Sequence, residues 1–341
     1  MEFNDGRVIE SFGRPYFVAE LNTSHFGDVD TAKRMIDAAL EVGCDCVKFQ
    51  SWSPDTLYSA TYYKKNPIAR RVVARFSFSL EKQKELADYS RSRGIAFSST
   101  PYSNREVDFL INECSVPFIK IASMEINNYP YLEYIARTGS AIVLSTGMAD
   151  LLEIERAIDC IRRAGNKRLC VLHCVSVYPA LPEDINLNNI SELRRLFPEL
   201  PIGYSDHTVG IATPVAAVAL GAAIIEKHFT LDSARIGMDN QMAMEPGQFR
   251  EMVTACNSAW SSLGRSDRVV SASELAQRVN MRRSIVSRRF IGKGETISIG
   301  DIDFKRPGDG FSPGQVTSVV GKQATQDIGS DEVIYPGMVG S

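Results

Sequence analysis

Residues 221–232 read GAAIIEKHFTLD, and they pass directly from an apolar run into charge. The first five residues are small or apolar, which is typical of a strand entering a protein core. Glu226, Lys227 and His228 then follow with no turn residue between them. We expect this strand to end at a polar site, with the three ionisable side chains on the floor of one pocket.

Seven similar runs precede this strand, and amphipathic segments separate several of them. The eight predicted strands are residues 16–20, 45–50, 95–99, 118–122, 141–145, 169–173, 202–205 and 223–228. The predicted helices are residues 30–42, 80–93, 151–164 and 213–220, and a glycine directly follows each of them. Glycine is a common stop signal for helices, so the alternation predicts repeated βα units and a parallel sheet.

The sheet is predicted to close into a (β/α)8 TIM barrel, because eight βα units in about 250 residues are typical of that fold. An open, doubly wound sheet of eight strands is the alternative. No GxGxxG motif follows the first strand, so the sequence offers no dinucleotide site. The long connection at residues 51–79 contains three tyrosines, and its length predicts a lid or a partner contact.

The chain changes character near residue 265, and we expect two domains. Residues 1–265 form the predicted barrel, which is the catalytic domain, and residues 266–282 are polar and predict a linker. Residues 283–341 contain a quasi-repeat, IGKGETI at 291–297 and IGSDEVI at 328–334. Two similar β-turn units that face one another would form a small β-rich domain, which is marginally stable alone at this size.

Composition narrows the possible partners and the compartment. The formal net charge of −3 gives no reason to expect nucleic acid or an anionic membrane as a partner. We expect no transmembrane helix, because no run of about 18 apolar residues occurs, and the polar N-terminal segment predicts no secretory signal. The seven cysteines, an odd number, predict free thiols in a reducing compartment, so we expect a cytoplasmic protein.

Polar residues gather at the predicted carboxyl ends of all eight strands. In strand order they are Glu20; Lys48 and Gln50; Ser98, Ser99 and Thr100; Lys120 and Ser123; Ser145 and Thr146; His173, Ser176 and Tyr178; Ser205, Asp206 and His207; Glu226, Lys227 and His228. These ends meet at one face of a parallel barrel, which is where such enzymes keep their active sites. Two lysines among many hydroxyl groups predict a bound phosphate or carboxylate.

Two histidines are candidate metal ligands. His207 and His228 end adjacent strands, and two imidazoles with carboxylates nearby suit an octahedral ion that keeps water or substrate oxygens. Mn²⁺, Mg²⁺ and Co²⁺ are the candidates.

Simpler structural roles remain open for several of these residues. Lys48 and Lys120 could form buried salt bridges with Glu20 or Glu226. His173 could point into the packed layers of the barrel, and His25 could cap the helix that follows it.

The motifs of the chain resemble those of the sialic acid (N-acetylneuraminate) synthase family. They are VAELNTSHFGD, DCVKFQ, FSSTP, IKIAS, LSTGM, VLHCVSVYP, GYSDHTVG, IIEKHFTLD and KRPGDGFSP, in the family's order over nearly the whole chain. The resemblance implies a (β/α)8 barrel followed by an antifreeze-like (SAF) domain. It also implies condensation of phosphoenolpyruvate with an N-acylated hexosamine, with Mn²⁺ the most suitable metal.

The resemblance also implies a role for individual residues. His207 and His228 match metal ligands, and Glu20, Glu226, Lys48 and Lys120 match groups at the reacting centre. The positions that match phosphoenolpyruvate contacts are Lys48, Thr100, Lys120, Ser123, Ser145, Ser176 and Ser205. Gln50, Tyr178 and Asp239 match sugar contacts. Arg306 matches an arginine that the SAF domain inserts into the partner subunit's site, which implies a domain-swapped homodimer.

Some positions depart from the family pattern, and they cluster on the sugar side. Ser24 replaces the asparagine of NHxGD, Met238 replaces a proline, and Asn280 stands where some synthases have an aromatic residue. The acceptor could therefore be N-acetylmannosamine or a diacetamido-dideoxyhexose, the precursor type of legionaminic and pseudaminic acids. The alternative functions are a pyruvate lyase or aldolase with a Schiff-base lysine, Lys120 or Lys48, and a non-catalytic sugar-binding protein.

Overall fold

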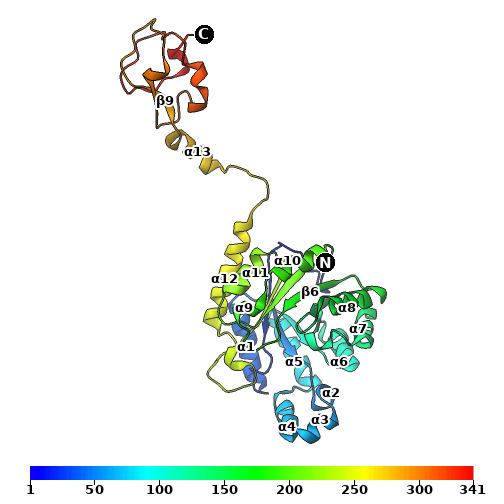
Figure 1. Cartoon of the computed structure of the whole chain (residues 1–341). Coiled ribbons are helices and arrows are strands. Elements are labelled where there is room, and N and C mark those ends of the chain that lie inside the picture. The colour runs from blue at the N-terminus through cyan, green and yellow to red at the C-terminus, as the bar shows by residue number, and fades with distance from the viewer. Residues whose placement is uncertain (341) are drawn as a thin grey trace. The chain divides into compact units, whose positions relative to one another are not determined.

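A computed structural model describes residues 1–340, and the chain divides after Gly264 into two compact units (Figure 1). In the first unit the strands are β1 (Tyr16–Glu20), β2 (Cys46–Gln50), β3 (Ala96–Thr100), β4 (Ile119–Ile121), β5 (Ile142–Ser145), β6 (Leu169–Cys174), β7 (Ile202–Asp206) and β8 (Ile224–His228). Each predicted strand is present, and its ends agree to within one residue.

The eight strands form one parallel sheet in the order β3-β2-β1-β8-β7-β6-β5-β4, which confirms the predicted barrel. Between β3 and β4, within residues 1–340, no backbone ladder closes the ring. The two strands are instead joined by Ser98 Oγ, which donates to Phe118 O at 3.1 Å. The barrel is therefore closed by a side-chain contact at this seam.

Helices pack around the strands (Figure 1). They are α1 (Val29–Glu41), α5 (Leu80–Arg93), α6 (Asn104–Phe109), α7 (Tyr129–Arg137), α8 (Leu151–Arg163), α9 (Pro182–Ile185), α10 (Asn188–Leu196), α11 (Ala212–Ala219) and α12 (Pro246–Leu263). The α1 N-cap is Asp28, whose carboxylate accepts from Thr31 N, so the capping role considered for His25 is wrong. His25 instead stacks on Phe78, with ring centroids 4.1 Å apart.

The long connection after β2 is helical, which the sequence prediction missed. It contains α2 (Pro54–Leu57), α3 (Ala60–Lys65) and α4 (Pro67–Phe76), which lie together in Figure 1. Serine side chains cap α2 and α3, and prolines occupy the first turns of α2 and α4. Such capping signals define short helices that lack a long apolar periodicity.

The barrel interior is filled by apolar side chains away from the carboxyl ends. One buried cluster joins Phe3 and Ile9, from the N-terminal segment, to strand residues that include Tyr16, Phe118 and Leu172. The Phe3 ring contacts the Tyr16 ring edge-on, with centroids 5.2 Å apart. Because this packing leaves no room for a ligand, the polar carboxyl ends are the place for a site.

The second unit begins with α13 (Ala272–Met281), a helix within the segment predicted as a linker. It continues with β9 (Ser284–Ser287) and β10 (Ile302–Lys305), which pair antiparallel. The two halves of the quasi-repeat face one another as predicted, because Ile291 and Ile328 exchange two backbone hydrogen bonds. The core residues of this unit are Ile285, Ile291, Ile297, Ile302, Val319, Ala324, Ile328 and Ile334.

A search of the described helices finds none that combines the length and the apolar character needed to cross a membrane.

The packing of the barrel interior can be tested at Gly203 on β7. A Cβ atom there would lie 2.5 Å from Leu172 Cδ2 and 2.9 Å from Ile224 O. We expect Gly203→Ala to lower the free energy of unfolding by about 1–3 kcal/mol, measured by chemical denaturation, because the core must shift to admit the methyl group. The matched control is Gly247→Ala in α12, where nothing lies within 4 Å and alanine favours the helix. Equal stability of the two variants would contradict the packing described.

Candidate active site

A pocket of about 330 Å³ opens at the carboxyl ends of the barrel strands. It brings together every barrel residue predicted for the site: Glu20, Lys48, Gln50, Thr100, Lys120, Ser123, Ser145, Ser176, Tyr178, Ser205, His207, Glu226, His228 and Asp239. Arg306 lies in the other unit, where it is exposed, and its side chain forms no hydrogen bond or ion pair within residues 1–340.

Strand alternation explains the charged end of β8. Successive side chains of a strand point to opposite faces, so Glu226 and His228 line the pocket. Lys227 points the other way and forms a buried ion pair with Asp206. The prediction that all three ionisable residues form the pocket floor is therefore wrong for Lys227, and the same holds for Asp206 on β7.

Other members of the predicted polar ring also lie outside the pocket. Ser99 Oγ bonds to Ser51 Oγ at 2.6 Å, and Thr146 Oγ1 donates to the Leu172 carbonyl. His173 contacts the Ile185 carbonyl through Nε2, which supports the structural role considered for it. These side chains satisfy backbone or helix-layer groups next to the barrel.

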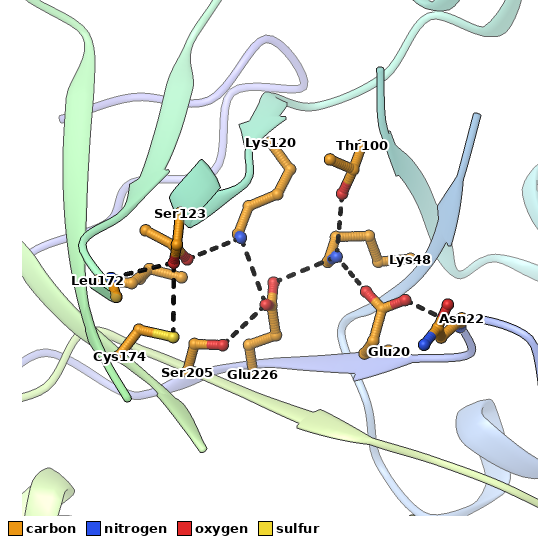
Figure 2. Close-up of polar contacts among 12 residues, drawn as sticks. Glu20, Asn22, Lys48, Thr100, Lys120, Ser123, Leu172, Cys174, Ser205 and Glu226 are labelled. Atoms are coloured by element: carbon orange, nitrogen blue, oxygen red, sulfur yellow. Dashed lines mark hydrogen bonds and ion pairs between the residues drawn. The ribbon is translucent and has the colours of Figure 1, made fainter. Parts of the chain in front are cut away.

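Four buried charged residues form the base of the pocket. Glu226 lies between two lysines: its carboxylate is 3.7 Å from Lys48 Nζ and 3.4 Å from Lys120 Nζ (Figure 2). Lys48 also forms an ion pair with Glu20. The salt bridges considered as a structural alternative are therefore present, but they lie inside the pocket and face its cavity.

The two carboxylates differ in their proton affinity. Burial alone would raise the pKa of Glu226, but the ammonium groups of Lys120 and Lys48 outweigh it and lower this pKa to about 2. Burial raises the pKa of Glu20 above its ordinary value, although Lys48 opposes the shift. Glu226 therefore binds a proton more weakly than Glu20 does, and Glu20 is the carboxylate better suited to take up a proton.

Hydroxyl groups lie next to the two lysines and accept hydrogen bonds from their ammonium groups. Lys48 Nζ donates to Thr100 Oγ1 at 3.2 Å, and Lys120 Nζ donates to Ser145 Oγ at 2.8 Å. Ser205 Oγ donates to Glu226 Oε1 at 3.0 Å. Lys48 thus has two carboxylate partners and one hydroxyl partner, Lys120 has one of each, and the group as a whole can bind an anion.

Ser123 and Ser176 lie beside a close approach of the backbone. Gly147 N donates to Ser123 Oγ at 3.0 Å. A Cβ at Gly147 would fall 2.1 Å from Ser176 Oγ, so only glycine leaves room for this hydroxyl group. Both serines also approach Cys174 Sγ, at 3.7 and 3.9 Å.

The two imidazoles fit a pair of ligands for one cation. Their ring centroids are 5.5 Å apart. His207 Nδ1 contacts the Val175 carbonyl at 2.7 Å, which fixes that nitrogen as the donor and leaves Nε2 available to a ligand. Burial and the neighbouring His207 lower the pKa of His228, so His228 is neutral. In residues 1–340 no three His, Cys, Asp or Glu residues form a complete metal cage, so a cation on the two imidazoles would take its further ligands from water or substrate.

The residues predicted to contact a sugar belong to a second network of contacts. Gln50 Nε2 donates to Glu20 Oε1 at 3.2 Å, and Gln50 Oε1 accepts from Tyr102 OH at 2.8 Å. Asn22 Nδ2 donates to Asp239. Tyr178 packs on the His207 ring, with centroids 4.2 Å apart. These contacts connect the predicted sugar residues to the charged base.

The sequence prediction missed several pocket residues. They are Asn22, Trp52, Leu57, Tyr58, Tyr102, Ala122, Met124, Met148 and Cys174. Most of them follow a strand by only a few residues, which is the one signal that was available. Cys174 was assigned to packing, and its burial agrees, but its thiol also faces the pocket.

Comparison with known proteins identifies the family. The model of the NeuB family matches residues 35–268, and that of the SAF domain matches residues 282–340. A relative from Legionella pneumophila, an N,N'-diacetyllegionaminic acid synthase, is 38% identical over 92% of this chain and 91% of its own. The N-acetylneuraminate-9-phosphate synthase of Mus musculus is 34% identical over 98% of this chain and 95% of its own.

A solved structure agrees with this result. The N-acetylneuraminic acid synthetase of Leptospira borgpetersenii is 34% identical, with a TM-score of 0.73 over 79% of this chain and 92% of its own. The chain therefore belongs to the NeuB family, as predicted, and it is a transferase of the sialic acid synthase type. Because these relatives are synthases, the alternative of a non-catalytic sugar-binding protein falls away.

Glu226 can be tested as the ion that stabilises the base of the pocket. Glu226→Gln should lower the free energy of unfolding at pH 7 by roughly 3 kcal/mol, because Lys120 loses its carboxylate partner. Folding lowers the Glu226 pKa from 4.5 to about 2, so its stabilisation is complete above pH 4.5 and is lost as the pH falls through 2. Denaturation curves between pH 2 and 7 measure this difference.

The control for this variant is Glu20→Gln. Lys48 keeps Glu226 as a partner in this control, and burial already favours a neutral Glu20. We expect a smaller loss of stability that does not decrease at acid pH. If both variants lose the same free energy with the same pH profile, the assignment of the ionised carboxylate is wrong.

Proposed function

We propose that the protein condenses phosphoenolpyruvate with an N-acylated hexosamine aldehyde and water, giving a nine-carbon 2-keto sugar acid and phosphate. The observation that carries this proposal is the buried pair of ammonium groups, Lys48 and Lys120, with hydroxyl groups around both. An enol phosphate offers a phosphate and a carboxylate to such a group. The names of the relatives, which are synthases of sialic acid type, support the same chemistry.

The reaction needs one carbon–carbon bond to form and one carbon–oxygen bond to break. C3 of the enol phosphate attacks the aldehyde carbon, and the aldehyde oxygen takes up a proton. Water adds to C2, where positive charge develops, and releases a proton. The bond between C2 and the bridging oxygen then breaks, the proton of the new C2 hydroxyl group passes to the departing phosphate, and the 2-keto group remains. Lys48 and Lys120 stabilise the negative charge of the donor throughout.

The pKa shifts of the two carboxylates, Glu20 and Glu226, indicate what role each one takes in the reaction. Glu20, whose pKa burial raises, is suited to donate a proton to the aldehyde oxygen. Glu226 is ionised and accepts a hydrogen bond from Ser205, and its pKa of about 2 makes it a weak base, so it is suited to orient the attacking water rather than to take up the proton that water releases. This assignment separates two roles that the sequence leaves open.

We propose that His207 and His228 hold a divalent cation, with Mn²⁺ the first choice and Mg²⁺ or Co²⁺ the alternatives. Bound there, the cation would polarise the aldehyde carbonyl as a Lewis acid. A protonated imidazole has no lone pair for a cation, so cation binding should weaken at acid pH.

The proposal also covers the sugar acceptor, the oligomeric state and the cellular location of the protein. Gln50, Tyr178 and Asp239 bind the sugar, which is N-acetylmannosamine or a diacetamido-dideoxyhexose. Arg306 acts in the site of the partner subunit in a domain-swapped homodimer. The seven cysteines are free thiols, which supports a cytoplasmic location.

A Schiff-base pyruvate lyase is the second candidate, and one observation favours it. Burial lowers the pKa of Lys120, which is a property that a nucleophilic lysine needs. Its ion pair with Glu226 opposes this role, because the carboxylate stabilises the charged amine.

Phosphate release tests the proposed function. We expect release from phosphoenolpyruvate only with an N-acylated aldose present, in a panel of N-acetylmannosamine, mannose and diacetamido sugars with Mn²⁺. Chelation or His207→Ala with His228→Ala should lower kcat by at least about 100-fold, since the carbonyl loses its electrophile. Full activity after either change would refute the metal role. Trapping of the enzyme by borohydride with pyruvate would favour the lyase.

The swapped assembly is tested by mixing two inactive variants. Arg306→Ala and Glu226→Gln should each be inactive as homodimers. In a swapped dimer the hybrid has one complete site, formed by the Arg306→Ala barrel and the intact arginine of the other chain. We expect unfolding and refolding of an equal mixture to restore about a quarter of the wild-type activity, since half of the dimers are hybrids with one site each. No recovery in hybrids confirmed by mass spectrometry would exclude swapping.

A further inference from the structure

The ion pair of Asp206 and Lys227 lies directly behind the pocket and has no part in the chemistry described above. The two residues pair across β7 and β8, and both side chains point away from the barrel interior. Lys227 is 1% exposed and Asp206 is 0% exposed. A charged pair buried this completely needs a reason, because apolar residues of similar volume are often as stable or more stable.

Every polar atom of this pair has a partner. Asp206 Oδ1 accepts from Tyr204 OH and from Thr208 N, both at 2.9 Å. Lys227 Nζ donates to Asp206 Oδ2 and to the Thr208 carbonyl, the latter at 2.7 Å. Thr213 Oγ1, at the start of α11, donates to Asp206 Oδ1 at 3.3 Å. The network therefore holds the backbone that follows β7 from both sides.

The positions of these contacts matter for the pocket. Asp206 and Thr208 are the two neighbours of His207 in sequence, and Lys227 directly precedes His228. The pair thus fixes the backbone on both sides of one imidazole and immediately before the other. Since alternate side chains share a backbone, fixing the outward residues also fixes the inward ones.

We infer that Asp206 and Lys227 are positioning residues, which set the separation and direction of the His207 and His228 rings by locking the ends of β7 and β8. The inference rests on the proposed role of these rings as cation ligands. It predicts that a variant with an apolar or neutral pair in this place still folds, but that the His207 and His228 rings are no longer held in fixed positions. Supporting residues of this kind commonly change metal affinity by about 10- to 100-fold.

The experiment uses the full-length chain and three variants, Asp206→Asn, Lys227→Met and the double variant. Each single variant leaves one charge or polar group without its partner, so we expect a lower Tm. The double variant leaves no unpaired charge, and its Tm should recover most of the loss. Its affinity for Mn²⁺, measured by electron paramagnetic resonance on the metal-depleted protein, should stay at least about tenfold weaker than that of the wild type.

A second readout does not depend on metal. The chain has four histidines, so ring labelling gives four NMR signals. In the apo double variant the signals of His207 and His228 should shift or split, whereas that of His25, which stacks on Phe78, should not. The matched control is Asp45→Asn, a carboxylate paired with Arg7 and Arg14 just before β2. This change should lower Tm and leave both Mn²⁺ affinity and the four ring signals unchanged.

The outcomes separate this inference from the proposed function. Unchanged His207 and His228 signals together with wild-type Mn²⁺ affinity in the double variant would overturn the positioning role. If the wild type binds no Mn²⁺, the proposed metal chemistry fails, and the ring signals alone then support or overturn the inference.

Discussion

The site depends on burying four charged groups together at one end of a barrel. Glu20, Lys48, Lys120 and Glu226 are each at most 5% exposed. A buried ion is tolerable only when opposite charges and hydrogen bonds replace its hydration. Parallel strands make this possible, because β1, β2, β4 and β8 each deliver one of these side chains to the same end of the sheet. The barrel is therefore a scaffold that holds these charges in contact.

The same ion pairs explain how two buried lysines can remain charged and still be available to an anionic substrate. Without substrate, Glu226 balances Lys120 and part of the charge of Lys48, so neither lysine is left unpaired. The proposed donor would bring further negative charge to the same ammonium groups. Its field would raise the proton affinity of both carboxylates, and Glu20, whose pKa burial already raises, would be first to take up a proton. Donor binding and proton loading of Glu20 would thus be coupled.

Much of the fold and of the pocket could be predicted from the sequence, because both follow from simple periodicities. Eight apolar runs between glycine-terminated helices identify the strands, and the convergence of their carboxyl ends brings the polar residues together. The prediction failed where one residue had two possible directions. Lys227 was placed in the pocket although a period of two already assigns it to the other face from Glu226 and His228.

Other features depend on contacts between residues that are far apart in the sequence, and no local sequence pattern predicts such contacts. The choice of Glu226 as the ionised carboxylate follows from its two lysine neighbours. Asn22 and Tyr102 join the pocket through contacts with Asp239 and Gln50, which are remote in sequence. The helices α2 and α3 and the helix α13 escaped prediction because they are short or lack a buried apolar face.

The division between strands and loops suggests why relatives with this barrel make different products. The charged base and the hydroxyl groups lie on strands or directly after them, where backbone pairing fixes their positions. Tyr58, Met148, Tyr178 and Asp239, at the outer part of the pocket, lie outside the strands. Loop residues can change without disturbing the ladder, so acceptor preference can vary while the bond-forming chemistry stays. Met238, which departs from the family pattern, belongs to this outer layer of the pocket, whereas the ion pair of Asp206 and Lys227 lies behind the strand ends that form its base.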